Sequence, residues 1–63
     1  MTKVKYYRLK QGLRQLDLAK KADISLSWIW VLENSFQQRV SREIKERVAK
    51  ALNCPYEKLF SSQ

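Results

Sequence analysis

Apolar residues in this chain recur at three- and four-residue spacings, and they nowhere alternate with polar residues over any length. That spacing is typical of helices that bury one face, whereas alternation would indicate strands. The pattern therefore predicts an all-α fold without a sheet. Residues 35–40 form a loop by composition, and Phe36 is expected to pack beneath it. The rest divides into a compact bundle of five short helices, at about residues 2–11, 15–21, 26–34, 42–52 and 56–60.

Residues that end and begin helices stand between these segments. Gly12 and Asn53 can adopt the left-handed backbone conformation that ends a helix, and Pro55 can begin one. Ser25 and Ser41 are favourable N-caps, because a serine hydroxyl can accept a hydrogen bond from a free amide at a helix start. The short connections leave little room for anything but a helical bundle.

Composition narrows the function mainly by exclusion. Sixty-three residues form one domain, which buries only about 60% of the surface of its unfolded chain, so a deep enzyme pocket is not expected. Histidine is absent and Cys54 is the single cysteine, which argues against triads, thiol–histidine pairs and the usual zinc sites. We expect no enzyme activity, metal, cofactor or small-molecule ligand. Cys54 is interpreted as a small core residue. A cytoplasmic location is expected, since no apolar run resembles a signal peptide or is long enough to span a membrane.

The charge balance favours an anionic partner. Thirteen lysines and arginines against six acids give a net charge of +7. A compact surface with that excess attracts polyanions such as nucleic acid, although a solvated basic face would have the same composition. The basic residues are spread along the chain, which indicates a folded basic surface rather than a disordered tail.

Residues 15–34 have the pattern of two helices around a tight turn. Ala19 supplies the small residue that lets two such helices cross closely. The apolar residues expected to fill the space around it are Leu18, Ile24, Ile29 and Leu32.

The order of residues resembles the Cro/repressor-type (XRE-like) helix-turn-helix family of phage and bacterial transcriptional regulators. The resemblance runs from Val4 to Phe60 and rests on Arg8, Gly12-Leu13, Gln15, Leu18-Ala19, Ile24-Ser25, Ile29, Leu32-Glu33-Asn34, Val40-Ser41, Glu43, Val48-Ala49-Lys50-Ala51-Leu52 and Leu59-Phe60. It implies a lambda-repressor-like fold in which the third helix lies in the major groove of double-stranded DNA and the second crosses the backbone. Such proteins commonly bind as dimers. A homodimer of this chain would use residues 56–63, form only on DNA, or draw on sequence beyond these residues.

The resemblance also implies roles for individual residues. Arg8 and Glu33 match positions that form a structural ion pair between the first and third helices. The positions that match base-reading residues are Leu26, Ser27, Trp30 and Val31. The candidates for phosphate contacts are Arg14, Gln15, Trp28, Asn34, Gln37, Gln38, Arg39, Ser41 and Arg42.

Arg14 departs from the family pattern, which usually has serine or threonine as the cap at this position. Arginine forgoes a cap of ~1 kcal/mol and places a cation at the unfavourable end of a helix. Contact with DNA would be one compensation. On this hypothesis, Arg14→Ser stabilises the free domain but weakens DNA binding.

The third helix is unusually apolar for a helix that reads DNA. At about 100° per residue, Ser25, Leu32 and Glu33 are expected to face inward with Ile29, and Ser27, Val31 and Asn34 outward. Only Ser27 among the base-reading candidates is polar, so discrimination would depend on contacts with thymine methyl groups and on DNA shape.

Two other interpretations remain open for the tryptophans. Trp28 could be largely core, and Trp30 could belong to a protein-contact surface. The alternative function is therefore a protein-interaction module that uses the apolar face formed by Trp28, Trp30 and Val31. Positive charge gathered around the second and third helices would favour DNA, and dispersed charge would favour a protein partner.

Overall fold

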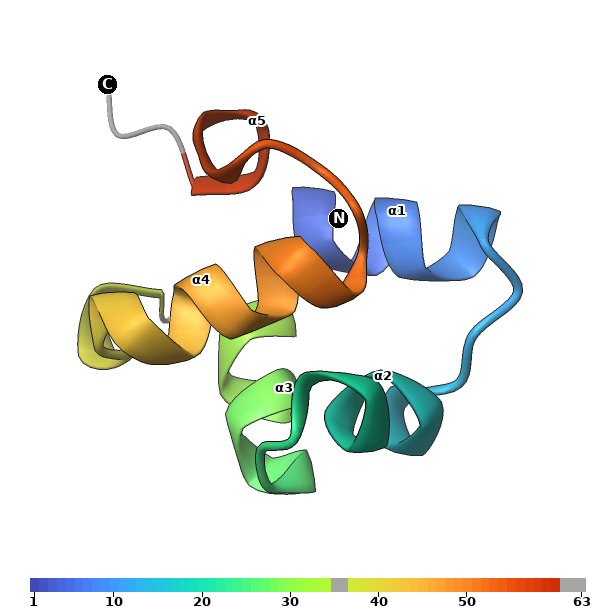
Figure 1. Cartoon of the computed structure of the whole chain (residues 1–63), viewed down its shortest axis with the longest axis horizontal. Coiled ribbons are helices and arrows are strands. Elements are labelled where there is room, and N and C mark those ends of the chain that lie inside the picture. Colours follow the sequence, from blue (N-terminus) through green and yellow to red (C-terminus); the bar gives the residue numbers. More distant parts are fainter. Residues whose placement is uncertain (35–36, 61–63) are drawn as a thin grey trace.

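A computed structural model describes residues 1–34 and 37–60, so the expectation that Phe36 packs beneath the loop lies outside the described residues. The fold is all-α, as expected, and the described residues contain no strand. The helices, labelled in Figure 1, are α1 (Lys3–Lys10), α2 (Gln15–Ala22), α3 (Leu26–Glu33), α4 (Arg42–Ala51) and α5 (Tyr56–Phe60), with a short 3-10 helix, η1 (Gln37–Arg39), before α4. No observed helix end differs from the expected one by more than one residue. The presence of η1 corrects the expectation of an irregular loop.

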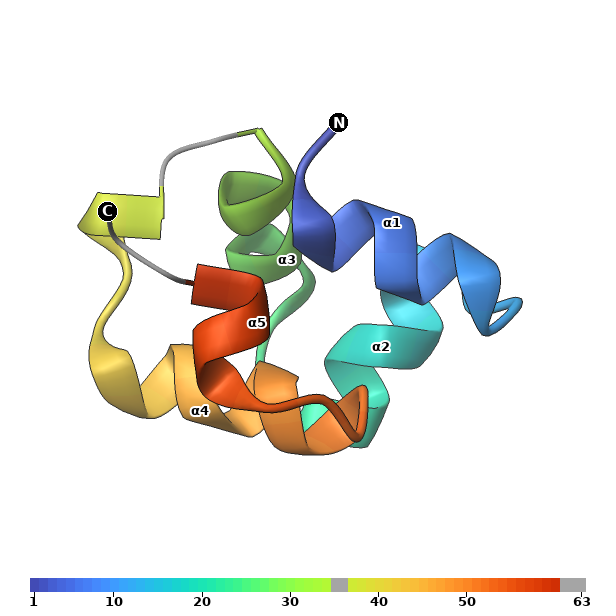
Figure 2. The same cartoon turned by 90° about the horizontal axis from the view of Figure 1, so that it is seen from above.

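The helices surround one core. α2 packs against α3 and α4, while α5 packs against α1 and α4, and α1 also contacts α3. Figure 1 shows α2 and α3 together on one side of the molecule, with α5 on the opposite side; Figure 2 shows α5 lying over α4. The largest fully buried side chains are Leu18, Ile29, Leu32, Val48 and Leu52. These residues come from α2, α3 and α4 or its cap, so the core holds the helix-turn-helix segment directly against α4.

Three helices end in the same way, with a left-handed residue that turns the chain. After α1, Gly12 has φ +73°, its amide donates to Leu9 at 3.0 Å, and the Leu13 amide donates to Arg8 at 3.1 Å. This pair of hydrogen bonds is the Schellman motif. Asn53 ends α4 in the same conformation, which confirms the expectation for both residues. Asp23 ends α2 likewise, a role that aspartate fills less often than glycine or asparagine.

The two serine caps differ. Ser41 caps α4 as expected, because its Oγ accepts a hydrogen bond from the Ile44 amide at 3.3 Å. The corresponding prediction for Ser25 is wrong. Its hydroxyl lies 3.0 Å from the Ser27 hydroxyl, and the Trp28 amide donates instead to the Ser25 carbonyl. Ser25 is also exposed rather than inward-facing, so it begins α3 through its extended backbone alone.

Candidate nucleic-acid interface

A buried ion pair fixes the carboxyl-terminal end of α3 against α1. The Arg8 guanidinium donates through Nε to Glu33 Oε2 at 2.6 Å and through Nη2 to Glu33 Oε1 at 3.1 Å. Only 8% and 2% of the two side chains are exposed. A two-point contact between a guanidinium and a carboxylate sets orientation as well as distance. The structure therefore contains the ion pair that the resemblance implied. This pair fixes the orientation of α3 relative to α1.

The same network includes the start of α2. Arg8 Nη1 donates to the Leu13 carbonyl at 2.8 Å, and Gln15 Nε2 donates to Glu33 Oε1 at 3.1 Å. Gln15, the first residue of α2, is a phosphate candidate, and one amide proton of its side chain is already used within the protein. Its second amide proton remains available to an anion, since a glutamine amide has two donors. The network thus sets the spacing between a candidate phosphate contact and α3.

The outer side of α3 is mainly apolar. Leu26 and Trp30 keep 44% and 54% of their surface exposed, and they lie one helical turn apart. Ser27 is exposed beside them. The expectation that Val31 points outward is wrong, because this side chain is half-buried and packs against the core. Three of the four base-reading candidates therefore share an exposed surface, which we call the outer face of α3: Leu26, Ser27 and Trp30.

Trp28 lies outside the core. It keeps 36% of its surface exposed and is neither part of the core cluster nor among the side chains packed against it, so the interpretation of Trp28 as largely core is wrong. Asn34, which follows α3, is exposed and donates through Nδ2 to the Trp30 carbonyl at 2.7 Å. This contact closes the last turn of α3. The amide of Asn34 is therefore partly occupied by the helix itself.

Asp17 compensates for the unfavourable cation that Arg14 places at the start of α2, a contact that was not expected from the sequence. Its guanidinium donates to Asp17 through Nε at 3.1 Å and Nη2 at 3.3 Å, while its backbone amide donates to the same carboxylate at 2.9 Å. The side-chain hydrogen bond, followed by the backbone one, lowers the pKa of Asp17 below its usual value. Asp17 also lies in the first turn of α2, where a negative charge is favourable. Contact with DNA is therefore not needed to explain Arg14.

The start of α4 holds an oriented cation. Arg42 Nε donates to Glu46 Oε2 at 3.0 Å, and its guanidinium carbon lies 4.3 Å from the centre of the Tyr56 ring. The hydrogen bond with Glu46 raises the pKa of Arg42 above its usual value. Stacking of this kind limits the positions that an exposed arginine can take. Arg42 is thus held beside the free amides of α4, with its guanidinium still largely exposed.

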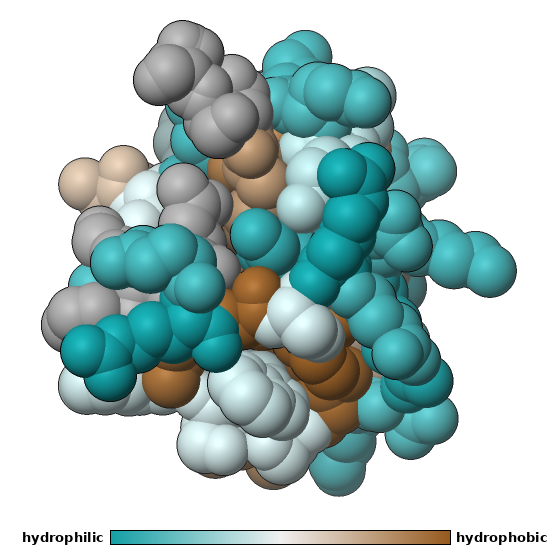
Figure 3. Space-filling model, turned by 90° about the vertical axis from the view of Figure 1, so that its left-hand side faces the viewer, coloured by the Kyte–Doolittle hydropathy of each residue, from teal (hydrophilic) through white to brown (hydrophobic). Residues whose placement is uncertain are grey.

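The remaining phosphate candidates lie in and after η1. Gln37, Gln38 and Arg39 form this short helix, and the exposed Ser41 follows it as the cap of α4. Figure 3 views the molecule from this end, where apolar residues are visible between hydrophilic ones. Arg39 and Arg42 place cations at this end, whereas α3 itself has no lysine or arginine.

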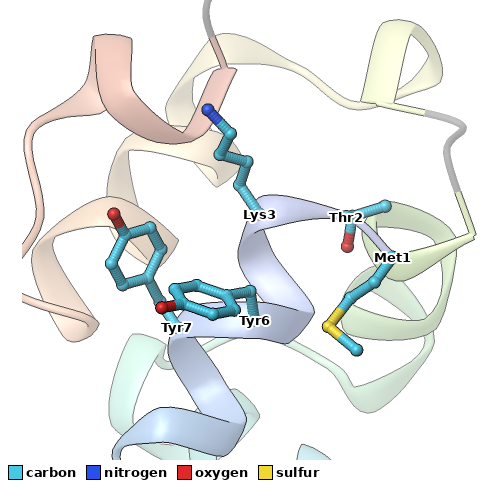
Figure 4. A pocket seen from close by; sticks show the side chains of 5 residues that line it. All are labelled: Met1, Thr2, Lys3, Tyr6 and Tyr7. Atoms are coloured by element: carbon cyan, nitrogen blue, oxygen red, sulfur yellow. The ribbon is translucent and has the colours of Figure 1, made fainter.

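A hollow of a different kind lies at the start of the chain. Figure 4 shows its lining residues, which all belong to α1 or precede it: Met1, Thr2, Lys3, Tyr6 and Tyr7. The Tyr6 and Tyr7 rings meet edge to face, with 5.0 Å between their centres. None of these residues comes from α2 or α3.

No group of acids and Cys54 in residues 1–34 and 37–60 is arranged to hold a metal ion, and no helix there is long and apolar enough to cross a bilayer.

The helix-turn-helix arrangement agrees with a comparison of the sequence with known families. A family model described as helix-turn-helix matches residues 4–59. The chain belongs to the XRE-type helix-turn-helix family. This helix-turn-helix protein is accordingly a DNA-binding regulator in the general sense. Searches of curated proteins and of solved structures found no match to it.

Family membership also bears on the alternative function. Basic side chains occur on α1, α2, α4 and α5 but not on α3, so the positive charge of this helix-turn-helix protein is dispersed. By charge alone, a protein partner would be favoured. The family match does not favour a protein partner; it indicates DNA as the partner.

Sequence reasoning missed the contacts that support the candidate site. Asp17 pairs with Arg14, the ring of Tyr56 lies against the Arg42 guanidinium, and Gln15 donates to Glu33 of the buried ion pair. The three-residue spacing of Arg14 and Asp17 was a usable signal, because residues three apart on a helix are neighbours. The contact between Arg42 and Tyr56 joins distant parts of the sequence and had no local signal.

Proposed function

We propose that this protein is a small transcriptional regulator of phage or bacterial type that binds double-stranded DNA with sequence selectivity. It acts in the cytoplasm by occupying its site rather than by catalysing a reaction. The observation that carries the proposal is the arrangement of α3: its inner side is fixed by the buried Arg8–Glu33 pair, and its outer face is exposed. A helix held in this way can enter a major groove as a rigid unit.

Phosphate contacts on both sides of α3 supply the attraction that α3 lacks. On one side, Arg14 and Gln15 stand at the start of α2, whose free amides and dipole favour an anion. On the other side, Arg39 and Arg42 stand near the start of α4. Contacts of this kind fix the register of a protein on DNA, while base contacts give the sequence preference. The remaining phosphate candidates are Trp28, Asn34, Gln37, Gln38 and Ser41.

Selection from random duplex DNA at moderate salt tests this function. We expect a motif to be enriched, and we expect Trp30→Ala to weaken or change it, because Trp30 is the more exposed of the two large apolar residues on the outer face. Val31→Ala should affect the motif less, since Val31 is half-buried in the core. Failure of the wild-type protein to enrich any motif would overturn the proposed function.

The enriched motif also reports the assembly on DNA. A homodimer would select two half-sites in inverted repeat, with centres about one helical turn, ~34 Å, apart. Sedimentation of the free protein and of its complex would show whether the dimer exists before DNA binds. A single half-site, bound by one protein, would rule out the dimer without affecting the DNA-binding proposal.

A further inference from the structure

The polar side chains beside the outer face of α3 are already hydrogen-bonded within the protein. The Ser27 hydroxyl pairs with that of Ser25 at 3.0 Å, and the Asn34 amide donates to the Trp30 carbonyl at 2.7 Å. Reading a base edge by hydrogen bonds needs donors and acceptors that are free to point into the groove. These groups keep part of their hydrogen-bonding capacity, but the bonds within the protein hold them in fixed directions and restrict how they can meet a base edge.

The same holds at the start of α2. Gln15 uses one of its two amide protons on Glu33, at 3.1 Å. Glutamine and asparagine recognise adenine by a two-point contact that needs both the amide nitrogen and the carbonyl oxygen in one plane. A Gln15 side chain held toward Glu33 is poorly placed for this contact and better placed to donate to a phosphate.

What the outer face offers instead is an apolar pair. Leu26 and Trp30 are one turn apart and about half exposed, and α3 has no charged residue except the buried Glu33. In an unmodified major groove, the C5-methyl group of thymine is the apolar group that base edges present. From this match we infer that α3 reads C5-methyl groups on pyrimidines, with Leu26 and Trp30 as the residues that determine specificity.

The inference rests on the proposed function and makes it more specific. It predicts sites in which thymines face α3. It also predicts that 5-methylcytosine can replace a thymine there, because the methyl group occupies the same place in the groove. Burial of one methyl group contributes ~0.8 kcal/mol, which corresponds to about a fourfold change in affinity.

Two random duplex libraries that differ only in this methyl group provide the test. One contains thymine and the other contains uracil at every corresponding position. We expect a thymine-containing motif to be enriched from the first library, and we expect its uracil version to bind about fourfold more weakly for each methyl group contacted. Duplexes without the motif should bind equally well in both forms, which controls for effects of uracil on the backbone contacts.

Each result is decisive. Equal affinity for the thymine and uracil forms of the motif would overturn methyl recognition but leave the proposed function intact. No motif from either library would overturn both, and would leave a protein partner as the explanation for the outer face. Restored affinity when a contacted thymine–adenine pair is replaced by 5-methylcytosine–guanine would support the inference. No restoration relative to plain cytosine would count against it.

A pair of leucine variants assigns the effect to α3. Leu26→Gln should bring the ratio of thymine to uracil affinities toward one, because the apolar contact is lost. Leu9→Gln is the matched control, since Leu9 is a similarly exposed leucine on α1, 50% exposed against 44%. It should leave the ratio unchanged. Equal ratios in the two variants would remove Leu26 from the reading surface.

Discussion

The inner and outer sides of α3 differ in nearly every property, although they belong to the same eight residues. The inner side consists of Ile29, Leu32 and Glu33, all buried, and its one charge is matched by Arg8. The outer face, made of Leu26, Ser27 and Trp30, is exposed and has no charge. The inner side fixes where the helix lies, and the outer face determines what it can meet.

This difference explains why the sequence predicts the fold more directly than it predicts the binding partner. Changes on the inner side alter stability, because they create a cavity or leave a buried charge unpaired. Changes on the outer face alter recognition with little effect on folding. The predictions below separate these two kinds of effect, and they run from the largest expected change to the smallest.

Removal of Glu33 should have the largest effect on stability. Glu33→Ala leaves the Arg8 guanidinium buried without its partner, and breaking a buried pair in this way costs about 3–5 kcal/mol. For a domain this small, the melting temperature should fall by about 12 °C or more. Chemical and thermal unfolding followed by circular dichroism measure the change.

Glu43→Ala is the matched control for that variant. Glu43 also pairs with an arginine, Arg47, at 3.4 Å, but its side chain is 76% exposed. An exposed pair four residues apart on a helix contributes about 0.3–0.5 kcal/mol. Equal losses of stability in the two glutamate variants would contradict a structural role for the buried pair.

Loss of an anchoring cation should weaken binding without changing its sequence preference. Arg42→Gln removes the cation at the start of α4, so the slope of log affinity against log salt should become shallower by about 0.9. Lys50→Gln removes the same charge from the last turn of α4 and should leave the slope nearly unchanged. If both variants changed the slope equally, Arg42 would contribute only to the net charge.

The smallest effect concerns the ion pair at the start of α2. Because Arg14 lowers the pKa of Asp17 in the folded state, the contribution of Asp17 to stability is complete above its unfolded pKa of about 3.9 and is lost as the pH falls through the lower folded value. Arg14→Ser should raise the pKa of Asp17 only part of the way, since the backbone hydrogen bond at position 14 remains.

A titration of the Asp17 carboxyl carbon by NMR measures this shift. Lys50→Gln serves again as the control and should leave the Asp17 titration unchanged. An Asp17 pKa that is the same in the wild-type protein and in Arg14→Ser would show that the guanidinium contact does not persist in solution.

The inner residues were predictable because periodicity and the family resemblance both depend on burial. Gly12, Asn53 and Ser41 were also predictable, since each acts on its own backbone or on a neighbouring turn. Ser25 and Val31 were not. Ser25 directs its hydroxyl to Ser27, a choice between two local partners that the sequence does not decide. Val31 packs inward because a bundle of short helices buries a wider arc than an ideal helical wheel suggests.

The outer face was harder to interpret from the sequence for a physical reason. The identity of an exposed side chain depends on the partner that it contacts, and the sequence of one chain does not name that partner. The exposed Trp30 is therefore compatible with a DNA-contacting surface and with a protein-contacting one. The long-range contacts of the phosphate candidates Gln15 and Arg42 could not be predicted from the sequence either. Gln15 to Glu33 and Arg42 to Tyr56 are contacts between segments that only the folded chain brings together.

The ratio of affinities for the selected DNA site and for a scrambled duplex tests the central claim most directly, because it isolates sequence preference from general attraction. It should be measured at one salt concentration for the wild-type protein, Trp30→Ala and Arg42→Gln, with folding checked for each. We predict that Trp30→Ala lowers the ratio by about tenfold, as expected for lost apolar contacts with bases, while Arg42→Gln weakens both affinities and preserves the ratio. An unchanged ratio in folded Trp30→Ala would contradict the assignment of recognition to the outer face of α3.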